Sequence, residues 1–277
     1  MIPVVTRVRG GVAGVTIAMA LALLASTPCL AADPGWQAAE GSGCLVWNPR
    51  RKQGEVITWS GACEQGKANG TGELVWRFSE FGVPLEQRYE GEVRAGRLEG
   101  RGVLTWDNGG RYEGEFKNDR KHGRGVLSWP NGSRYEGQWR DDRRNGRGIQ
   151  VWGHGGRYEG EWKDDDIHGE GVLTFANGGM YSGSFQADKR HGRGVMTWPA
   201  GGRYEGGFAD NARSGQGVHE RANGDRYEGQ WAAGAPHGQG VALIAGERHE
   251  GSWNNGCIES RGTTVAWAKP VEKCEAP

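Results

Sequence analysis

Histidine recurs at one position of a repeating pattern in this chain. The residues concerned, each standing before a glycine, are His122, His168, His191 and His237. Imidazole is the commonest metal ligand, so the recurrence raises the question of a metal site. If each unit is a two-stranded hairpin, neighbouring histidines lie roughly 10 Å apart, whereas two nitrogens on one zinc lie within about 3–4 Å. Asn145 and Ser214 also replace histidine at this position. We therefore expect a turn or packing role and no metal.

Carboxylates are abundant, but no pattern among them indicates catalysis. The run Asp164-Asp165-Asp166 lacks the spaced ligands of a calcium loop and is interpreted as a solvated loop. There is no G-x-S-x-G elbow, phosphate-binding loop or H-E-x-x-H motif, and the many G-x-G steps fall inside strand-like segments instead of before helices. The sequence predicts a chain that is not an enzyme and that needs no cofactor.

The most regular charges are an arginine before and a glutamate after a recurring aromatic residue. The pairs that form the candidate partner-binding face are Arg111 and Glu113, Arg134 and Glu136, Arg157 and Glu159, Arg203 and Glu205, and Arg226 and Glu228. Residues two apart in a strand share a face, so each pair belongs to one ladder of alternating sign. Two interpretations stay open: a solvated, salt-bridged face that keeps the strand register, or a polar surface that binds a partner. Exposed ion pairs contribute little stability, which leaves the recurrence partly unexplained.

Aromatic residues recur in rows of their own. The candidate aromatic groove consists of Tyr112, Phe116, Trp129, Tyr135, Trp139, Trp152, Tyr158 and Trp162. These rings either form the core of the fold or provide a shallow groove for a glycan, a lipid or a peptide.

All of these recurring residues belong to a sequence repeat of 23 residues. It is counted from Tyr89, Tyr112, Tyr135, Tyr158, Tyr181, Tyr204 and Tyr227. With degenerate first and last copies, the array is expected to span residues 41–258 in about eight to nine units. Each unit has two strand-like segments, such as 111–116 and 123–129. Glycine weakens a strand, so the glycines between the rings need a packing reason, namely room for a ring over the backbone.

The two links of each unit differ in character. Asn131-Gly132 and its equivalents indicate a type I′ hairpin turn, whereas the charged stretch 117–123 is expected to be a longer, exposed loop. Successive hairpins predict an all-β fold, an elongated single-sheet solenoid of consecutive antiparallel β-hairpins that is stable only as an array. With 51 glycines, 13 tryptophans and only 36% hydrophobic residues, the chain of 277 residues does not suit a conventional aliphatic core.

The N-terminal residues resemble a secretory signal. Arg7 and Arg9 precede an apolar run at 12–25, and small residues at 29 and 31 suit cleavage near Ala31/Ala32. We expect residues 1–31 to be a signal peptide, residues 32–40 a linker and residues 259–277 a C-terminal tail or cap, with the mature chain in the periplasm. Without the two arginines the net charge is −2, which gives no strong attraction to nucleic acid.

Four cysteines remain after this cleavage: Cys44, Cys63, Cys257 and Cys274. An even number in an exported protein indicates two disulfides, for which three pairings are possible. We favour Cys44–Cys63 and Cys257–Cys274, because both are local and would close the two ends of the array.

The segments "YEGEFKNDRKHGRGVLSW" and "YEGEWKDDDIHGEGVLTF" resemble MORN (membrane occupation and recognition nexus) repeats. The resemblance implies an elongated β-hairpin solenoid that acts as a scaffold or dimerisation module, and the family name implies membrane binding. Some relatives carry kinase domains, but residues 32–40 and 259–277 are too short to be one, so kinase activity is not inferred.

We therefore expect an exported, non-catalytic scaffold that binds another envelope protein and can self-associate as a homodimer. The alternative is a module that binds membrane lipid headgroups or cell-envelope polysaccharide through its aromatic face.

Overall fold

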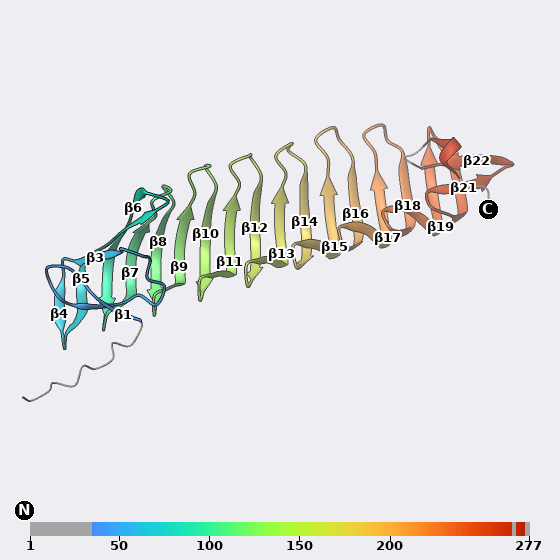
Figure 1. Cartoon of the computed structure of the whole chain (residues 1–277). Coiled ribbons are helices and arrows are strands. Elements are labelled where there is room, and N and C mark those ends of the chain that lie inside the picture. Colours follow the sequence, from blue (N-terminus) through green and yellow to red (C-terminus); the bar gives the residue numbers. More distant parts are fainter. Residues whose placement is uncertain (1–34, 268–269, 275–277) are drawn as a thin grey trace, which may run out of the picture. The chain divides into compact units, whose positions relative to one another are not determined.

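The repeats form consecutive antiparallel hairpins of one β-sheet. The structure is a computed structural model that describes residues 35–267 and 270–274, so the predicted signal peptide lies outside the described residues. Each strand pairs with the next one in the chain, from β5 to β20 (Figure 1). The strands of the regular repeats are β7 (Arg97–Thr105), β8 (Arg111–Lys117), β9 (Arg120–Ser128), β10 (Arg134–Arg140), β11 (Arg143–Val151), β12 (Arg157–Lys163), β13 (Asp166–Thr174), β14 (Met180–Gln186), β15 (Lys189–Thr197), β16 (Arg203–Ala209), β17 (Ala212–Glu220), β18 (Arg226–Ala232), β19 (Ala235–Ile244) and β20 (Glu247–Trp253). The predicted all-β fold of successive hairpins is confirmed.

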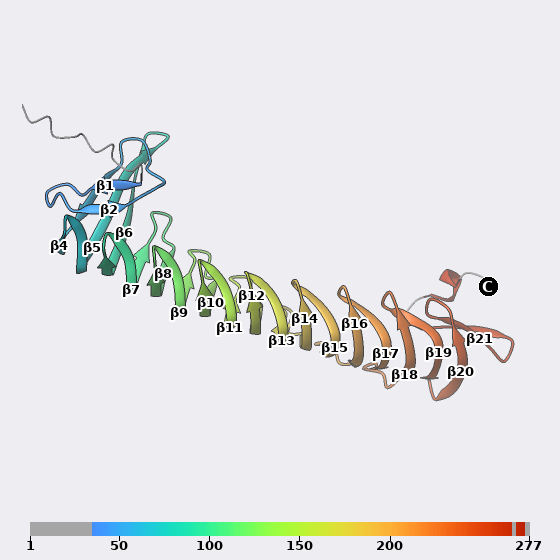
Figure 2. The same ribbon diagram turned by 90° about the horizontal axis from the view of Figure 1, so that it is seen from below.

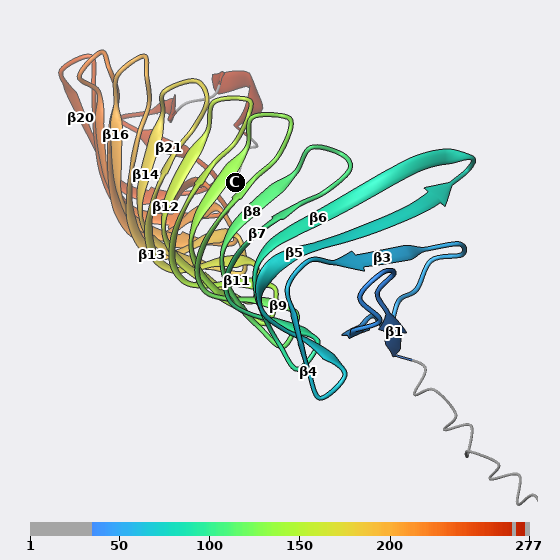
Figure 3. The ribbon, with the colours of Figure 1, turned by 90° about the vertical axis from the view of Figure 1, so that its left-hand side faces the viewer.

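The sheet begins with a longer hairpin, made by β5 (Lys67–Glu80) and β6 (Val83–Arg94), which extends beyond its neighbours (Figure 3). The extra residues before Tyr89 lie in this hairpin, and Phe81 at its tip is fully exposed. The short strands β3 (Val56–Trp59) and β4 (Ala62–Glu64) both pair with β5. The segments β1 (Trp36–Ala38) and β2 (Leu45–Trp47) pair with each other, and β2 joins β5 in parallel.

The chain after β20 forms a separate two-stranded sheet, β21 (Cys257–Ser260) and β22 (Thr263–Ala266). A single 3₁₀ turn, η1 (Val271–Lys273), follows. No helix in residues 35–267 or 270–274 is long and apolar enough to cross a membrane.

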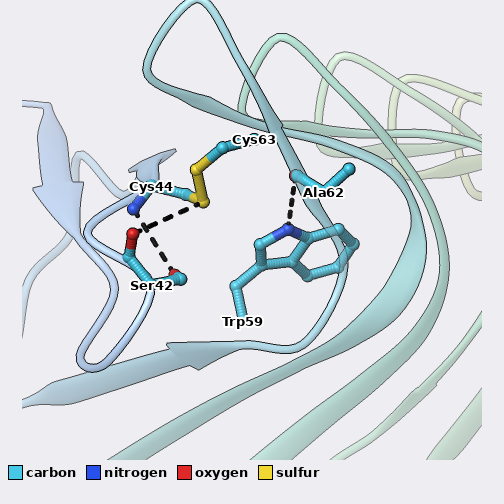
Figure 4. Close-up of a disulfide and its surroundings, with 5 residues drawn as sticks. All are labelled: Ser42, Cys44, Trp59, Ala62 and Cys63. Carbon is cyan, nitrogen blue, oxygen red and sulfur yellow. Dashed lines mark hydrogen bonds between the residues drawn. A yellow bond between two sulfur atoms is a disulfide. The ribbon is translucent and has the colours of Figure 1, made fainter.

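A disulfide lies at each end of the array. Cys44 is joined to Cys63, which connects the loop before β2 to β4 (Figure 4). Beside it, the Trp59 indole donates a hydrogen bond to the Ala62 carbonyl at 2.9 Å. Cys257 in β21 is joined to Cys274, directly after η1. This is the pairing expected from the local spacing of the cysteines.

The Asn-Gly link is not the predicted type I′ turn. In the loop between β9 and β10 the Gly132 amide donates to the Trp129 carbonyl at 3.0 Å, and Gly132 has φ +81°. Asn131 keeps a negative φ, whereas type I′ needs positive φ at both central residues. Pro130 fixes its own φ near −65° and favours this alternative turn.

The type I′ geometry occurs instead at the charged link, which the sequence analysis expected to be a long loop. Only Asn118 (φ +50°) and Asp119 (φ +67°) separate β8 from β9. Aspartate and asparagine tolerate this left-handed conformation better than most residues. The Asp119 carboxylate also accepts a hydrogen bond from the Leu98 amide at 2.8 Å. Each tight turn therefore ties its repeat to the preceding one.

The core is a row of rings in which tyrosine alternates with phenylalanine or tryptophan. Tyr112 meets Phe116 of its own hairpin and Trp139 of the next, edge to face, at centroid distances of 5.1 and 5.5 Å. The Tyr112 hydroxyl donates to the Glu115 carbonyl at 3.0 Å, so the strand curves around the ring. The curvature of the strands is visible in Figure 2.

Glycine makes room for each tyrosine. Gly114 and Gly125 face each other across β8 and β9. A Cβ added to either one would lie 2.6 Å from an atom of the Tyr112 phenol group. The packing reason expected for these glycines is therefore found within the same hairpin.

Candidate partner-binding groove

The two faces of the sheet differ in chemistry. Tyr112 is opposite Leu127 across β8 and β9, and Glu113 is opposite Val126. Because side chains alternate along a strand, these two pairs lie on opposite faces. We call the face that carries Tyr112, Leu127 and their equivalents the tyrosine face, and the face that carries Glu113, Val126 and their equivalents the glutamate face.

The predicted Arg–Glu ladder lies exposed on the glutamate face as ion pairs within each strand. The N–O distances are 2.7 Å for Arg111–Glu113, 2.8 Å for Arg134–Glu136, 2.6 Å for Arg157–Glu159 and 2.6 Å for Arg226–Glu228, and Arg203 pairs with Glu205 in the same way. The side chains of Arg111 and Glu113 are 48% and 59% exposed, so solvent screens the pair.

A groove of about 1190 Å³ crosses several repeats on this face. Its apolar residues are Val103, Val126, Ile149 and Val172. The glutamates Glu113, Glu136 and Glu159 alternate with these apolar residues in the same cross-strand row. Arg101, Arg124 and Arg147, each two residues before an apolar residue of the row, lie along one side of it, and glycines of the paired strands line the groove between them. The ladder arginines lie at the margin, where they pair with the glutamates.

A bulge in each hairpin shapes the arginine side of the groove. The register between β8 and β9 shifts after Gly114, which leaves the Arg124 amide without its ladder partner on that side. The Glu115 carboxylate accepts a hydrogen bond from this amide at 2.9 Å. One repeat later, the Gln138 side chain accepts from the Arg147 amide at the same distance. The column Glu115/Gln138 therefore holds the bulge in place.

Most of the candidate aromatic groove is core and not an open surface. Six of its eight rings are at most 5% exposed: Tyr112, Phe116, Tyr135, Trp139, Tyr158 and Trp162. Burial raises the pKa of the array's tyrosines, to about 12 at Tyr181. The rings are covered because each tyrosine packs against two neighbouring rings and two glycines. Trp129 and Trp152 are only partly buried.

The repeat pattern identifies the family. The sequence profile of the MORN repeat matches seven consecutive segments: residues 89–111, 112–134, 135–157, 158–180, 181–203, 204–226 and 227–243. The chain belongs to the MORN repeat family. MORN repeats are commonly protein- or lipid-binding scaffold modules, a non-catalytic type of repeat. A comparison with curated proteins gave no match.

The other polar columns of these MORN repeats have local roles. The His122 Nδ1 atom lies 4.0 Å from a carboxylate oxygen of Asp141, and it is buried without a hydrogen-bond partner among the residues that the structure describes. Within residues 35–267 and 270–274, no three His, Cys, Asp or Glu side chains converge as metal ligands would. The run 164–166 is not a loop: Asp164 and Asp165 form a tight turn and Asp166 begins β13.

The valine row of the groove was missed in the sequence analysis. Val126 was recognisable as lying opposite to the ring-bearing face, but one apolar residue per repeat on a charged face carries little signal by itself. Its meaning depends on the register, which places Val126 between Glu113 of β8 and Glu136 of β10. Only the paired strands bring Val103, Val126 and Ile149 into one line.

Proposed function

We propose that this MORN array is a non-catalytic scaffold of the cell envelope that binds another protein along its glutamate face. The observation that supports the proposal is the groove, which combines an apolar row with charged side chains over several repeats. Apolar contact surrounded by a polar rim is the usual composition of a protein interface.

The charges along the groove suit a partner with charges of both signs. Glu113, Glu136 and Glu159 lie between the apolar residues of the row, and Arg101 and Arg124 lie along one side of it. Rim charges of this kind steer encounter and exclude wrong partners more than they raise affinity. Such a role would also account for the recurring ion pairs, because exposed pairs contribute only about 0–1 kcal/mol to stability.

Export and self-association complete the proposal. Two disulfides are compatible with an oxidising compartment such as the periplasm. Self-association would use the C-terminal edge of the sheet, because among the described residues β20 pairs within that sheet with β19 alone. An unpaired strand edge offers hydrogen-bonding groups to a second copy. Light scattering of the purified chain at several concentrations tests this part.

The alternative, a site for lipid headgroups or envelope polysaccharide, has less support. It would depend on the partly buried tryptophans, such as Trp129 and Trp152, because the tyrosines are enclosed. An anionic lipid surface attracts clustered basic residues, and the alternating ladder on the glutamate face is not such a cluster.

The test is crosslinking in cells followed by recovery of the chain, with Arg111, Arg134 and Arg157 replaced by alanine in parallel. We expect one discrete protein partner with the unaltered chain, and loss of that partner with the triple variant. A matched control replaces Arg120, Arg143 and Lys189, three exposed cations at the starts of β9, β11 and β15.

The control removes the same charge next to the tight turns, so it should retain the partner. Equal recovery from all three chains would contradict a role for the ladder. Recovery of lipid or glycan without a protein would favour the alternative function.

A further inference from the structure

The tyrosine face carries a row of cations above its rings. Lys121, Arg144, Arg190 and Arg213 occupy this row at intervals of 23 residues, with Ile167 between them. The guanidinium carbon of Arg144 lies 4.1 Å from the centroid of the Trp162 ring, and that of Arg213 lies 4.1 Å from the centroid of Trp231. Cation–π contacts of this kind hold the charges against the core.

The first two cations have carboxylate partners. Lys121 pairs with Asp142 at 3.5 Å, and Arg144 pairs with Asp165 at 3.1 Å. These acids are the second residues of the tight turns in the next repeat. The carboxylate compensates a charge that the sheet partly buries.

The tight turns next to Arg190 and Arg213 have no aspartate at their second position. Asn211 takes the aspartate position opposite Arg190, and Gly234 takes it opposite Arg213. Each guanidinium donates to a backbone carbonyl, at 2.9 Å to Asn211 and at 2.6 Å to Gly234, as Arg144 also does to Asp165. No carboxylate of the described residues lies within ion-pair distance of either arginine. Burial lowers the pKa of Arg213 to about 10, so it remains charged at neutral pH.

A cavity of about 480 Å³ opens beside these two arginines. Phe175, Met196, Trp198 and Phe208 supply its apolar lining, together with the side chains of Arg190 and Arg213. The site therefore combines aromatic surface with positive charge that lacks a counterion.

One repeat further along the array, the position equivalent to this cavity is occupied by Trp267 of the same chain. It contacts Arg221, His219 and Tyr227, which stand 23 residues after Trp198, Met196 and Tyr204. The Arg221 guanidinium carbon lies 4.0 Å from the centroid of the indole. Arg221 also pairs with Asp225 at 3.2 Å. The occupied place therefore joins an arginine to an aromatic ring and a carboxylate.

We propose that the cavity between Arg190 and Arg213 binds a segment of another protein in which an aromatic side chain is flanked by acidic residues. The ring would lie against Trp198 and Met196 as Trp267 lies against Arg221 and His219. The carboxylates would pair with Arg190 and Arg213, which have no carboxylate within ion-pair distance among the described residues. This site lies on the tyrosine face and does not depend on the groove of the glutamate face.

The probe is an acetylated and amidated peptide, Gly-Asp-Trp-Asp-Gly, titrated into the purified, oxidised chain by calorimetry. The main variant is Asn211→Asp, which restores the acid found at Asp142 and Asp165 and so supplies Arg190 with an internal partner. Aspartate occurs at this turn position in other repeats, so the variant should fold. We expect its Kd to rise by about threefold or more, because the internal acid competes for the arginine.

The matched control is Gln138→Glu, which adds the same charge on the glutamate face at a position where other repeats have Glu115 and Glu161. Its Kd should equal that of the unaltered chain. Absence of peptide binding, an unchanged Kd in Asn211→Asp, or an equal weakening in both variants would overturn the proposal. Equal affinity for the peptide with asparagine in place of both aspartates would overturn it as well.

Discussion

The packing of the buried tyrosine in each repeat depends on two glycines, because a side chain at either position would overlap the tyrosine. At Gly125 an added methyl group would overlap the phenol of Tyr112, which is fully buried and hydrogen-bonded to the backbone of its own strand. The Tyr112 ring needs the space next to the Gly125 Cα atom, so even the methyl group of alanine should be too large there.

We expect Gly125→Ala to destabilise its hairpin by about 1–3 kcal/mol, as overpacked cores do. Hydrogen exchange of the β8 and β9 amides would measure this locally. Ser128→Ala, in the same strand, should change the protection by less than about 0.5 kcal/mol. Equal effects of the two substitutions would show that the close approach to Tyr112 is not limiting.

We expect His219 to make the C-terminal part of the array sensitive to acid. Burial, with the charges of Arg213 and Arg221, lowers its pKa from 6.5 to about 4. The unfolded chain therefore binds a proton between about pH 6.5 and pH 4 that the folded chain does not. Stability contributed by the neutral imidazole should be complete above this window and should fall as the pH decreases through it.

The measurement is hydrogen exchange at β18 to β21 across this pH window. His219→Leu introduces the residue found at the equivalent positions Leu127 and Leu173, and it should flatten the pH profile. An identical profile in the variant would exclude His219 as the cause.

At the scale of strands and turns, the sequence predicted the period and the two strands of each repeat, because alternation of ring and charge is a local signal. It did not predict the turns. Asn131-Gly132 indicated type I′, but Pro130 and the register give a different turn. Asp141 and Asp142 both have positive φ. The only sequence signal for this conformation is that aspartate tolerates it better than most residues do.

Ala187 tests the turn assignment. It has φ +47° at the position where other tight turns have Asn118 or Asp141. Alanine is strained in this conformation, so Ala187→Gly should stabilise the β14–β15 hairpin by about 0.5–1 kcal/mol. Thermal and denaturant unfolding would detect the gain.

The control is Ala212→Gly, at the start of β17, where φ is not positive. That substitution should give no gain, because glycine only adds freedom to the unfolded chain there. A loss of stability with Ala187→Gly would contradict the turn geometry.

At the scale of the whole array, each repeat contacts its neighbours, so stability should be local and the ends should be the weakest parts. The second disulfide, Cys257–Cys274, closes the segment that carries Trp267 onto His219 and Tyr227. The 23-residue period alone was enough to predict which residues recur at the candidate site. The groove depends on the pairing of strands, and the contact of Trp267 depends on the C-terminal segment folding back; no local sequence pattern predicts either.

Replacement of Cys257 and Cys274 by serine should therefore expose the C-terminal end. We expect reduced exchange protection in β18 to β21, by about 2–4 kcal/mol where the disulfide acts, and unchanged protection in β8 to β13. Uniform loss along the array would indicate a single cooperative unit instead of locally stabilised repeats.

A protein partner bound to the glutamate face would be detected by a photo-crosslinking amino acid placed at Val126 or Ile149 in the intact cell. A third position, Arg120 beside a tight turn, serves as the reference. We expect the first two positions to crosslink to the same discrete protein and the third position not to do so. Crosslinks to no protein at Val126 and Ile149, or the same products at all three positions, would contradict this expectation.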